Sequence, residues 1–308
     1  MTKLVIATRG SQLALWQANH IKTLIEAEHG VTCEIKIVKT RGDIYQDVPL
    51  AAMGGKGVFV KEIEERLLSS DVDLAVHSMK DVPAFIPSEL EIYANPKKEV
   101  SCDAFLSVKY GSIPELTEGA VVGTSSLRRK IQLKRVAPQV VINDLRGNID
   151  TRIRKLENGD YDAIILAEAG LRRLGLTKYI KQSIPSELIL PAACQGVLGI
   201  EVRKEDASVK SYLNFLKDEK TEVLVRAERA FLIRLDCGCY APAACHAEFL
   251  ESGLISVRGF LSDLQGNRFI KTQLQGEPEY ATSLGDKLAA EILAAGGGNI
   301  LKDLKELQ

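Results

Sequence analysis

A short segment that leads from an apolar stretch into two arginines carries the clearest chemical signal in this sequence. The apolar residues at 120–122 predict a buried strand, and Gly-Thr-Ser-Ser at 123–126 predicts a turn into a helix. Arg128 and Arg129 follow, and each guanidinium can bind a carboxylate or phosphate through two parallel hydrogen bonds. The turn also supplies hydroxyl groups that can cap free backbone N–H groups, those of Thr124, Ser125 and Ser126. The segment therefore predicts an anion site at a helix N-terminus.

The basic charge continues beyond this turn. Residues 121–155 contain nine lysines and arginines but only two aspartates, in a chain whose formal net charge is −1. This local excess predicts a polyanionic ligand bound in one cleft. Arg146 and Arg152 follow the next predicted strand and join the same predicted site, although a helix-surface role in solubility is the alternative for all four arginines. That alternative suits the remaining basic residues better, including Lys130, Lys134, Arg135 and Arg154.

Charged residues also follow three successive predicted strands near the start of the chain. Arg9 follows the strand at 4–8, Arg41-Gly-Asp43 follows the strand at 34–38, and Lys80-Asp81 follows the strand at 74–77. Because ligands gather beyond the carboxyl ends of strands in open α/β sheets, these positions predict a second half of the site. The alternative for Lys80 and Asp81 is a solvated pair of opposite charges in a loop.

Composition and length limit the class of protein. With 308 residues, 45% hydrophobic and 26% charged, the chain is typical of a soluble protein with two or three domains. It begins with a strand-like segment rather than a signal peptide, and no apolar run approaches the roughly 20 residues of a membrane helix. We therefore expect a cytoplasmic protein. A sequence pI near 6.5 argues against a nucleic-acid partner, and Tyr161 is the aromatic residue close to the basic segment that could stack on a base.

The predicted elements form two α/β units and a smaller third region. Strands at 4–8, 34–38 and 74–77, with a helix capped by Ser11 and another opened by glycines at 54–57, predict a parallel, doubly wound sheet. A second unit of this kind has predicted strands at 105–108, 120–122, 140–142 and 163–166 and helices at 127–136 and 149–157. The strand at 198–202 is expected to return to the first sheet.

We therefore expect three domains. The first two, at 1–98 with 196–217 and at 99–195, resemble the clamshell of periplasmic solute-binding proteins, with the ligand in the cleft. The third, at 218–308, is expected to be a small α+β domain with an antiparallel sheet. It has a helix ending near 236, strands at 254–261 and 268–274, and a helix at 280–294.

Cysteines cluster in the third region. A disulfide framework is not expected in the reducing cytoplasm. One interpretation of the cluster is a zinc site that uses Cys237, Cys239, Cys245 and His246, although this spacing fits the usual separated pairs of ligands poorly. The other is a single exposed thiol on a loop that turns at Gly238. The remaining cysteines are expected to be buried and structural: Cys33, Cys102 and Cys194.

Taken together, these segments resemble the porphobilinogen deaminase (hydroxymethylbilane synthase) family, in order and over nearly the whole chain. The shared motifs include Ala-Thr-Arg-Gly-Ser-Gln-Leu-Ala-Leu-Trp-Gln, Thr-Arg-Gly-Asp, Gly-Gly-Lys-Gly-Val-Phe-Val-Lys-Glu, His-Ser-Met-Lys-Asp-Val-Pro, Val-Gly-Thr-Ser-Ser-Leu-Arg-Arg, Leu-Arg-Gly-Asn, Asp-Ala-Ile-Ile-Leu-Ala and Leu-Pro-Ala-Ala-Cys-Gln-Gly. The third region matches least, apart from its cysteine loop.

The resemblance implies a transferase that joins four porphobilinogen molecules into a linear tetrapyrrole on a covalently bound dipyrromethane cofactor. Each porphobilinogen loses ammonia to form an electron-poor azafulvene, which the terminal pyrrole of the enzyme-bound chain attacks; water finally releases the product. The resemblance implies thioether attachment of the cofactor to Cys239 and a catalytic role for Asp81, whose carboxylate would stabilise positive charge on a pyrrole nitrogen. It implies a monomer.

The resemblance also implies which residues bind the acetate and propionate groups of the pyrrole rings. They are Arg9, Ser11, Lys80, Thr124, Ser125, Ser126, Arg128, Arg129, Arg146, Gly147, Arg152, Arg173 and Gln195. The loop at 43–57 is expected to act as a mobile lid that includes Lys56, with Phe59 beside it. Two positions depart from the family pattern: Ala52 stands where a cofactor-binding lysine is expected, and Cys237 stands where glycine is expected.

Overall fold

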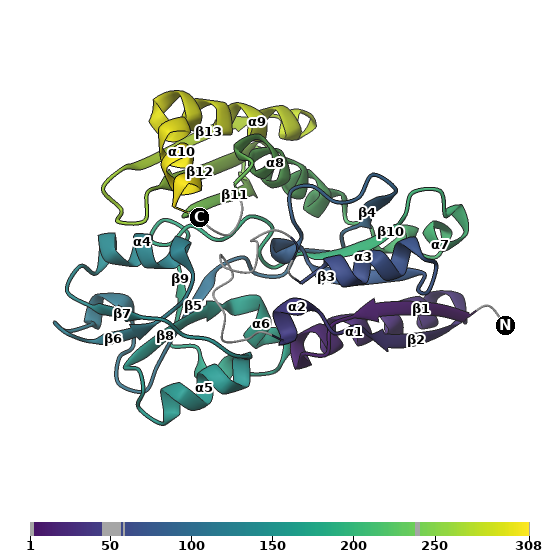
Figure 1. Cartoon of the computed structure of the whole chain (residues 1–308), viewed down its shortest axis with the longest axis horizontal. Coiled ribbons are helices and arrows are strands. Elements are labelled where there is room, and N and C mark those ends of the chain that lie inside the picture. Colours follow the sequence, from purple (N-terminus) through teal and green to yellow (C-terminus); the bar gives the residue numbers. More distant parts are fainter. Residues whose placement is uncertain (1–2, 45–56, 58, 238–240, 308) are drawn as a thin grey trace. The chain divides into compact units, whose positions relative to one another are not determined.

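A computed structural model of the chain describes residues 3–44, 57, 59–237 and 241–307. The chain divides into two compact units, one of residues 1–99 and 196–222 and the other of residues 100–195 and 223–308. Figure 1 labels the helices and strands along the chain. Each unit is described by itself below. The expected separation of three domains, with its exact boundaries, stays a prediction.

The first unit is built on a five-stranded sheet of order β2-β1-β3-β10-β4. The β1, β2 and β3 strands are parallel, as predicted, and the segment at 198–202 does return to this sheet as β10. Because β10 runs antiparallel to both β3 and β4, the sheet is mixed. The strands are β1 (Lys3–Thr8), β2 (Thr32–Ile37), β3 (Leu74–Ser78), β4 (Leu90–Ala94) and β10 (Leu198–Arg203).

Helices cover both faces of this sheet because successive residues of each strand point to opposite sides. Leu74 and Val76 pack in the core that includes α1, whereas Ala75 packs in the core that includes α3. Ser11 caps α1, as predicted, and its side chain accepts a hydrogen bond from the Ala14 N–H. The helices of this unit are α1 (Gln12–His29), α2 (Arg41–Ile44), α3 (Lys61–Leu68) and α7 (Ala207–Ser211).

The second unit contains a five-stranded sheet of order β7-β6-β8-β5-β9. The β6 strand is parallel to β7 and β8, whereas β5 is antiparallel to β8 and β9. Phe105 packs on the α4 side of the sheet and Leu106 on the α5 side. The elements are β5 (Asp103–Ser107), β6 (Val121–Gly123), α4 (Leu127–Val136), β7 (Val141–Asn143), α5 (Ile149–Glu157), β8 (Ala163–Ala167), α6 (Glu168–Arg173) and β9 (Gln182–Ile184).

The same unit also contains a three-stranded antiparallel sheet of order β11-β12-β13, which confirms the expected antiparallel sheet of the third region. Helices from α8 to α10 share one core with it. The α8 and α9 helices approach so closely that a Cβ atom on Gly285 would lie 1.9 Å from the Ala227 carbonyl oxygen, so only glycine fits there. The elements are α8 (Glu219–Leu235), whose residues from 223 onward belong to this unit, β11 (Ala243–Phe249), β12 (Ile255–Ser262), β13 (Phe269–Gly276), α9 (Ala281–Ile292), the π-helical turn Leu293–Gly297 and α10 (Gly298–Glu306).

None of the helices in the described ranges combines the length and the apolar character that a membrane span requires.

Candidate active site

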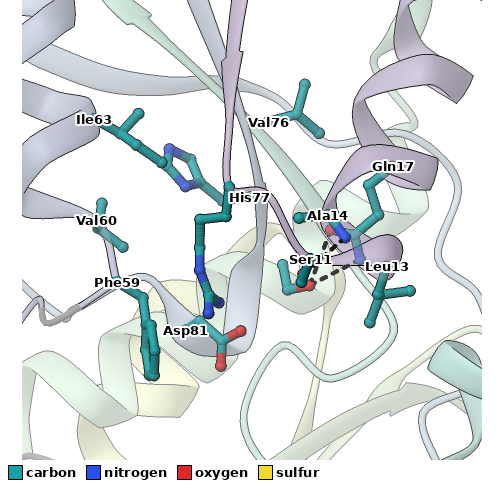
Figure 2. Close-up of a pocket in the computed structure, with 12 residues that line it drawn as sticks. Ser11, Leu13, Ala14, Gln17, Phe59, Val60, Ile63, Val76, His77 and Asp81 are labelled. Atoms are coloured by element: carbon teal, nitrogen blue, oxygen red, sulfur yellow. Dashed lines mark hydrogen bonds between the residues drawn. The ribbon is translucent and has the colours of Figure 1, made fainter. Parts of the chain in front are cut away.

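An open pocket in the first unit brings together the charged ends of the β1 and β3 strands. Its empty volume is about 430 Å³, and Arg9, Ser11, Phe59 and Asp81 line it. Figure 2 shows side chains of α1 on one side of Asp81 and those of the segment around Phe59 on the other. Lys80 precedes Asp81 in a single 3-10 turn and is exposed. Four of the predicted site residues, Arg9, Ser11, Phe59 and Asp81, therefore share one pocket.

Arg9 is held in place from two directions. Its Nη2 and Nε atoms lie 2.5 and 3.1 Å from Asp43 Oδ1, and its guanidinium stacks 4.1 Å from the centre of the Phe59 ring. Burial alone would raise the pKa of Asp43, but the hydrogen bond and charge of Arg9, together with hydrogen bonds from Thr40, outweigh burial and lower this pKa. Gly42 makes the stacking possible, because a Cβ atom there would lie 2.0 Å from the Phe59 ring. Arg9 is thus oriented at the pocket by its neighbours.

Three further polar residues line this pocket that the sequence did not predict as site residues: Gln17, His77 and Ser78. Gln17 is buried, and its Nε2 atom donates to Ser78 Oγ at 2.9 Å; both residues line the pocket. The signal for Ser78 was its place at the end of a strand, between His77 and Asp81. The signal for Gln17 was a polar residue next to Ala18 on the buried side of α1.

A buried polar cluster adjoins the pocket through His77, which is one of the lining residues. His77 Nε2 lies 2.9 Å from Glu201 Oε2, and both side chains are almost fully buried. Glu64 of α3 is also buried. Burial and the nearby charge of Glu201 raise the pKa of Glu64 to about 7, with partial compensation from His77. The cluster therefore contains a carboxyl group that changes charge near neutral pH.

The helix that follows the Thr-Ser-Ser turn begins at Leu127, but the turn is not capped as the sequence predicted. Ser126 occupies the N-cap position without a side-chain hydrogen bond to the helix. Instead, Thr124 Oγ1 accepts from the Ser126 N–H at 3.3 Å, and Ser125 Oγ donates to the Leu145 carbonyl at 3.0 Å. The capping expectation was wrong because these hydroxyls stabilise the turn and its neighbour rather than the helix.

Arg128 and Arg129 do not lie on the helix surface. Each is 7% exposed, and both contact the fully buried carboxylate of Asp103. Burial alone would raise the pKa of Asp103, but the charges of Arg128 and Arg129 outweigh it and hold the pKa well below its usual range. Gln195 donates from Nε2 to Asp103 Oδ1 at 2.9 Å. The structure thus joins three predicted site residues through an aspartate that the sequence analysis did not identify.

The turn between β7 and α5 lies beside the turn between β6 and α4. The two strands are parallel neighbours, and the Ser125–Leu145 hydrogen bond connects their turns. Within the second turn, Arg152 Nε donates to the Gly147 carbonyl at 2.7 Å. Arg146 is half-buried in this turn, whereas Arg173, also half-buried, is the last residue of α6. Lys134, Arg135 and Arg154 are exposed, as predicted for helix surface.

Several predicted residues of the cysteine loop and the lid cannot be placed. Cys239, Lys56 and Ala52 lie outside the described residues. Cys245 lies in the core of the three-stranded sheet, because the segment predicted as loop continues into β11. Cys237 and Cys102 are half-buried, whereas Cys33 and Cys194 are buried as predicted. In the part of the chain that the structure describes, no three His, Cys, Asp or Glu side chains are grouped to hold a metal ion.

Comparisons with known proteins cover nearly the whole chain. A family model described as "Porphobilinogen deaminase, dipyromethane cofactor binding domain" matches residues 4–211, and one described as "Porphobilinogen deaminase, C-terminal domain" matches residues 223–294. Among solved structures, the methionine-binding protein MetQ aligns with a TM-score of 0.43 and 13% identity, over 71% of this chain and 92% of its own.

Curated relatives agree with the family models. The porphobilinogen deaminase of Nitratidesulfovibrio vulgaris (strain DP4) is 50% identical over 306 residues, which are 99% of this chain and 97% of that protein. The porphobilinogen deaminase of Lawsonia intracellularis is 46% identical over 305 residues, with 99% of each chain covered. On these matches, the chain belongs to the porphobilinogen deaminase family.

Proposed function

We propose that Asp81 is the catalytic carboxylate with which this porphobilinogen deaminase joins four porphobilinogen molecules head to tail into hydroxymethylbilane. The family carries a dipyrromethane cofactor and acts in tetrapyrrole biosynthesis. The observation that carries the assignment of Asp81 is the pocket of the first unit, where its carboxylate lies with Arg9 and Ser11. We further propose that the enzyme acts as a monomer in the cytoplasm.

The chemistry of the pocket suits a substrate that combines a cationic centre with carboxylates. As ammonia leaves the aminomethyl group and the retained methylene carbon forms the new carbon–carbon bond, positive charge develops on pyrrole nitrogen. A carboxylate placed in the pocket, as Asp81 is, stabilises that charge where it forms. Arg9 is oriented by Asp43 and Phe59 and can bind an acetate or propionate group.

The second unit fits a group that carries several carboxylates. Arg129 Nε is buried and has no hydrogen-bond partner within the described residues, and it lies in the first turn of α4. An anion at a helix N-terminus is stabilised by the free N–H groups and the helix dipole. When bound, the dipyrromethane supplies the pyrrole carbon to which the first porphobilinogen is joined. In this unit we assign its carboxylates, and those of the growing chain, to Arg128, Arg129, Arg146, Arg152 and Arg173, with help from Thr124, Ser125, Ser126, Gly147 and Gln195. In the first unit we assign carboxylate binding to Lys80, beside Arg9 and Ser11.

We assign the covalent attachment to Cys239. The intact masses of denatured wild type, Cys239→Ser and Cys237→Ser decide this point. We expect the wild type and Cys237→Ser to carry an excess equal to two porphobilinogens less two ammonias, and Cys239→Ser to lack it. Loss of the excess in Cys237→Ser alone would move the attachment to the neighbouring thiol.

The role of Asp81 is tested on the same purified holoenzyme. We expect Asp81→Asn to keep the cofactor mass and to lower turnover of porphobilinogen at least about 100-fold, the scale of losing one group that stabilises transition-state charge. Asp71→Asn is the control, because Asp71 lies outside the pocket and pairs with Lys36 and Arg66. Unchanged turnover in Asp81→Asn would refute the assignment.

A further inference from the structure

Asp103, the first residue of β5, binds both arginines at the start of α4. Its Oδ2 atom lies 2.8 Å from Arg128 Nη1, and its Oδ1 atom lies 2.6 Å from Arg129 Nη2. The carboxylate has no exposed surface. A residue this deeply buried is not available to contact porphobilinogen itself, so any effect on the reaction must act through its partners.

Further hydrogen bonds fix each guanidinium at a second point. Arg128 Nη1 also donates to the Leu190 carbonyl at 2.8 Å, and Arg129 Nη1 donates to the Ile165 carbonyl at 3.0 Å. Gln195 donates to Asp103 Oδ1 and to the Ser101 carbonyl at 2.7 Å, which fixes the carboxylate in turn. Two long side chains that are ordered before a ligand arrives lose less entropy when they bind it.

The net charge of Asp103, Arg128 and Arg129 favours the binding of one anion. Two guanidiniums and one carboxylate, all buried, give a net charge of +1. Without Asp103, two like charges would face each other away from water, which is strongly unfavourable. Arg129 Nε is buried without a hydrogen-bond partner in the described part of the chain, so at least one N–H of the group is unsatisfied, a cost that a bound anion would offset.

We propose that Asp103 is a positioning residue of this enzyme: it holds Arg128 and Arg129 in the orientation that binds one carboxylate of the pyrrole chain. This inference rests on the proposed role of the two arginines in carboxylate binding. Asp103 then touches neither substrate nor cofactor, but it sets the geometry and the net charge of their binding site.

The test compares holoenzymes of the wild type, Asp103→Asn, Arg129→Gln, the charge-balanced double variant Asp103→Asn/Arg129→Gln and the control Asp263→Asn. Asp263 is also a buried carboxylate of the second unit, but it binds the backbone of residues 266–268 and the Arg268 side chain. Two readouts are used. One is turnover per cofactor-bearing molecule, and the other is the number of porphobilinogen-derived units that the intact protein carries after addition of limiting porphobilinogen.

We expect Asp103→Asn to lower turnover at least tenfold and to shift the carried units toward shorter chains, while Asp263→Asn stays within twofold of the wild type with an unchanged mass distribution. A merely structural role would lower stability in both variants and leave chain length unchanged. If Asp103→Asn does not fold, the double variant replaces it, and we expect its turnover to fall at least threefold below that of Arg129→Gln, because Arg128 is then misplaced.

The outcomes separate the two proposals. If Arg129→Gln lowers turnover but Asp103→Asn matches the wild type, or if the double variant equals Arg129→Gln, the positioning role of Asp103 is refuted and carboxylate binding by Arg129 stands. If Arg129→Gln itself leaves turnover and chain length unchanged, the proposed role of Arg129 fails, and the inference about Asp103 fails with it.

Discussion

Glu64 shows how burial changes the chemistry of a single residue. It is 8% exposed, and its Oε1 atom has no hydrogen-bond partner within the described residues. Its pKa rises from 4.5 to about 7 through burial and the charge of Glu201, with a smaller contribution from Glu65 and an opposing one from His77. Near neutral pH, the folded protein therefore binds a proton here that the unfolded chain has already released.

This residue predicts a fall in stability with rising pH. Because the pKa is higher in the folded state, the stabilisation is complete below pH 4.5 and is lost as pH rises through 7. The full shift corresponds to roughly 3 kcal/mol of unfolding free energy. Urea unfolding between pH 5 and 8 should show this fall in the wild type and in Glu118→Gln, whose site is exposed, and a flatter profile in Glu64→Gln. Parallel profiles in all three proteins would show that Glu64 does not cause the fall in stability with rising pH.

At the residue scale, the sequence predicted those site residues whose position follows from strand order. Arg9 and Asp81 each follow a parallel strand, so their meeting in one pocket could be anticipated. Asp103 could not be identified in this way, because it stands at the start of a strand rather than at its end. Its contact with α4 depends on the position of β5 next to β8 in the sheet, which the sequence does not reveal. Gln17 was missed because its hydrogen-bond partner, Ser78, lies far away in the sequence and comes close only in the folded structure.

The turn between β7 and α5 is an element whose shape depends on one glycine. Gly147 has φ of +107°, and a Cβ atom there would lie 2.8 Å from Thr151 Cγ2. Its carbonyl accepts the hydrogen bond from Arg152. An alanine would therefore strain the backbone and displace Thr151, and with it the first turn of α5.

We expect Gly147→Ala to lower both stability and activity. Backbone strain alone costs about 1–2 kcal/mol. Gly159→Ala is the matched control, because Gly159 has φ of +82° and open space where its Cβ would lie. In urea unfolding both variants should lose stability, with the larger loss in Gly147→Ala. In kinetics only Gly147→Ala should raise KM for porphobilinogen; an equal KM in the two variants would show that the turn does not position the carboxylate site.

At the element scale, prediction succeeded where apolar periodicity was regular. The helices predicted at 127–136 and 149–157 have these bounds in the structure. The β11 strand was missed because its cysteine and small residues were interpreted as a loop, although half of its side chains face a core. The antiparallel direction of β10 depends on how the chain returns to the first sheet, which its residues do not reveal.

At the scale of the whole molecule, the second unit combines two sheets with separate cores, and a few contacts connect them. Leu190 packs against Ala244 and Phe260 of the three-stranded sheet. Glu228 of α8 accepts hydrogen bonds from the Cys194 N–H and, at 2.8 Å, from the Ala247 N–H. Its carboxylate thereby ties the end of the β9–β10 connection to β11.

Removing that carboxylate tests whether the two sheets unfold as one. Glu228→Ala leaves two buried N–H groups without their acceptor, a loss of roughly 2–5 kcal/mol for a charged acceptor with two bonds. We expect hydrogen exchange under increasing urea to show one common transition for β6, β8 and β12 in the wild type and in Glu222→Ala, a control on the same helix. In Glu228→Ala, we expect the exchange transition of β12 to occur at a different urea concentration from that of β6 and β8. A common transition there would show that the apolar contacts of Leu190 suffice to couple the five-stranded sheet of this unit to its three-stranded sheet.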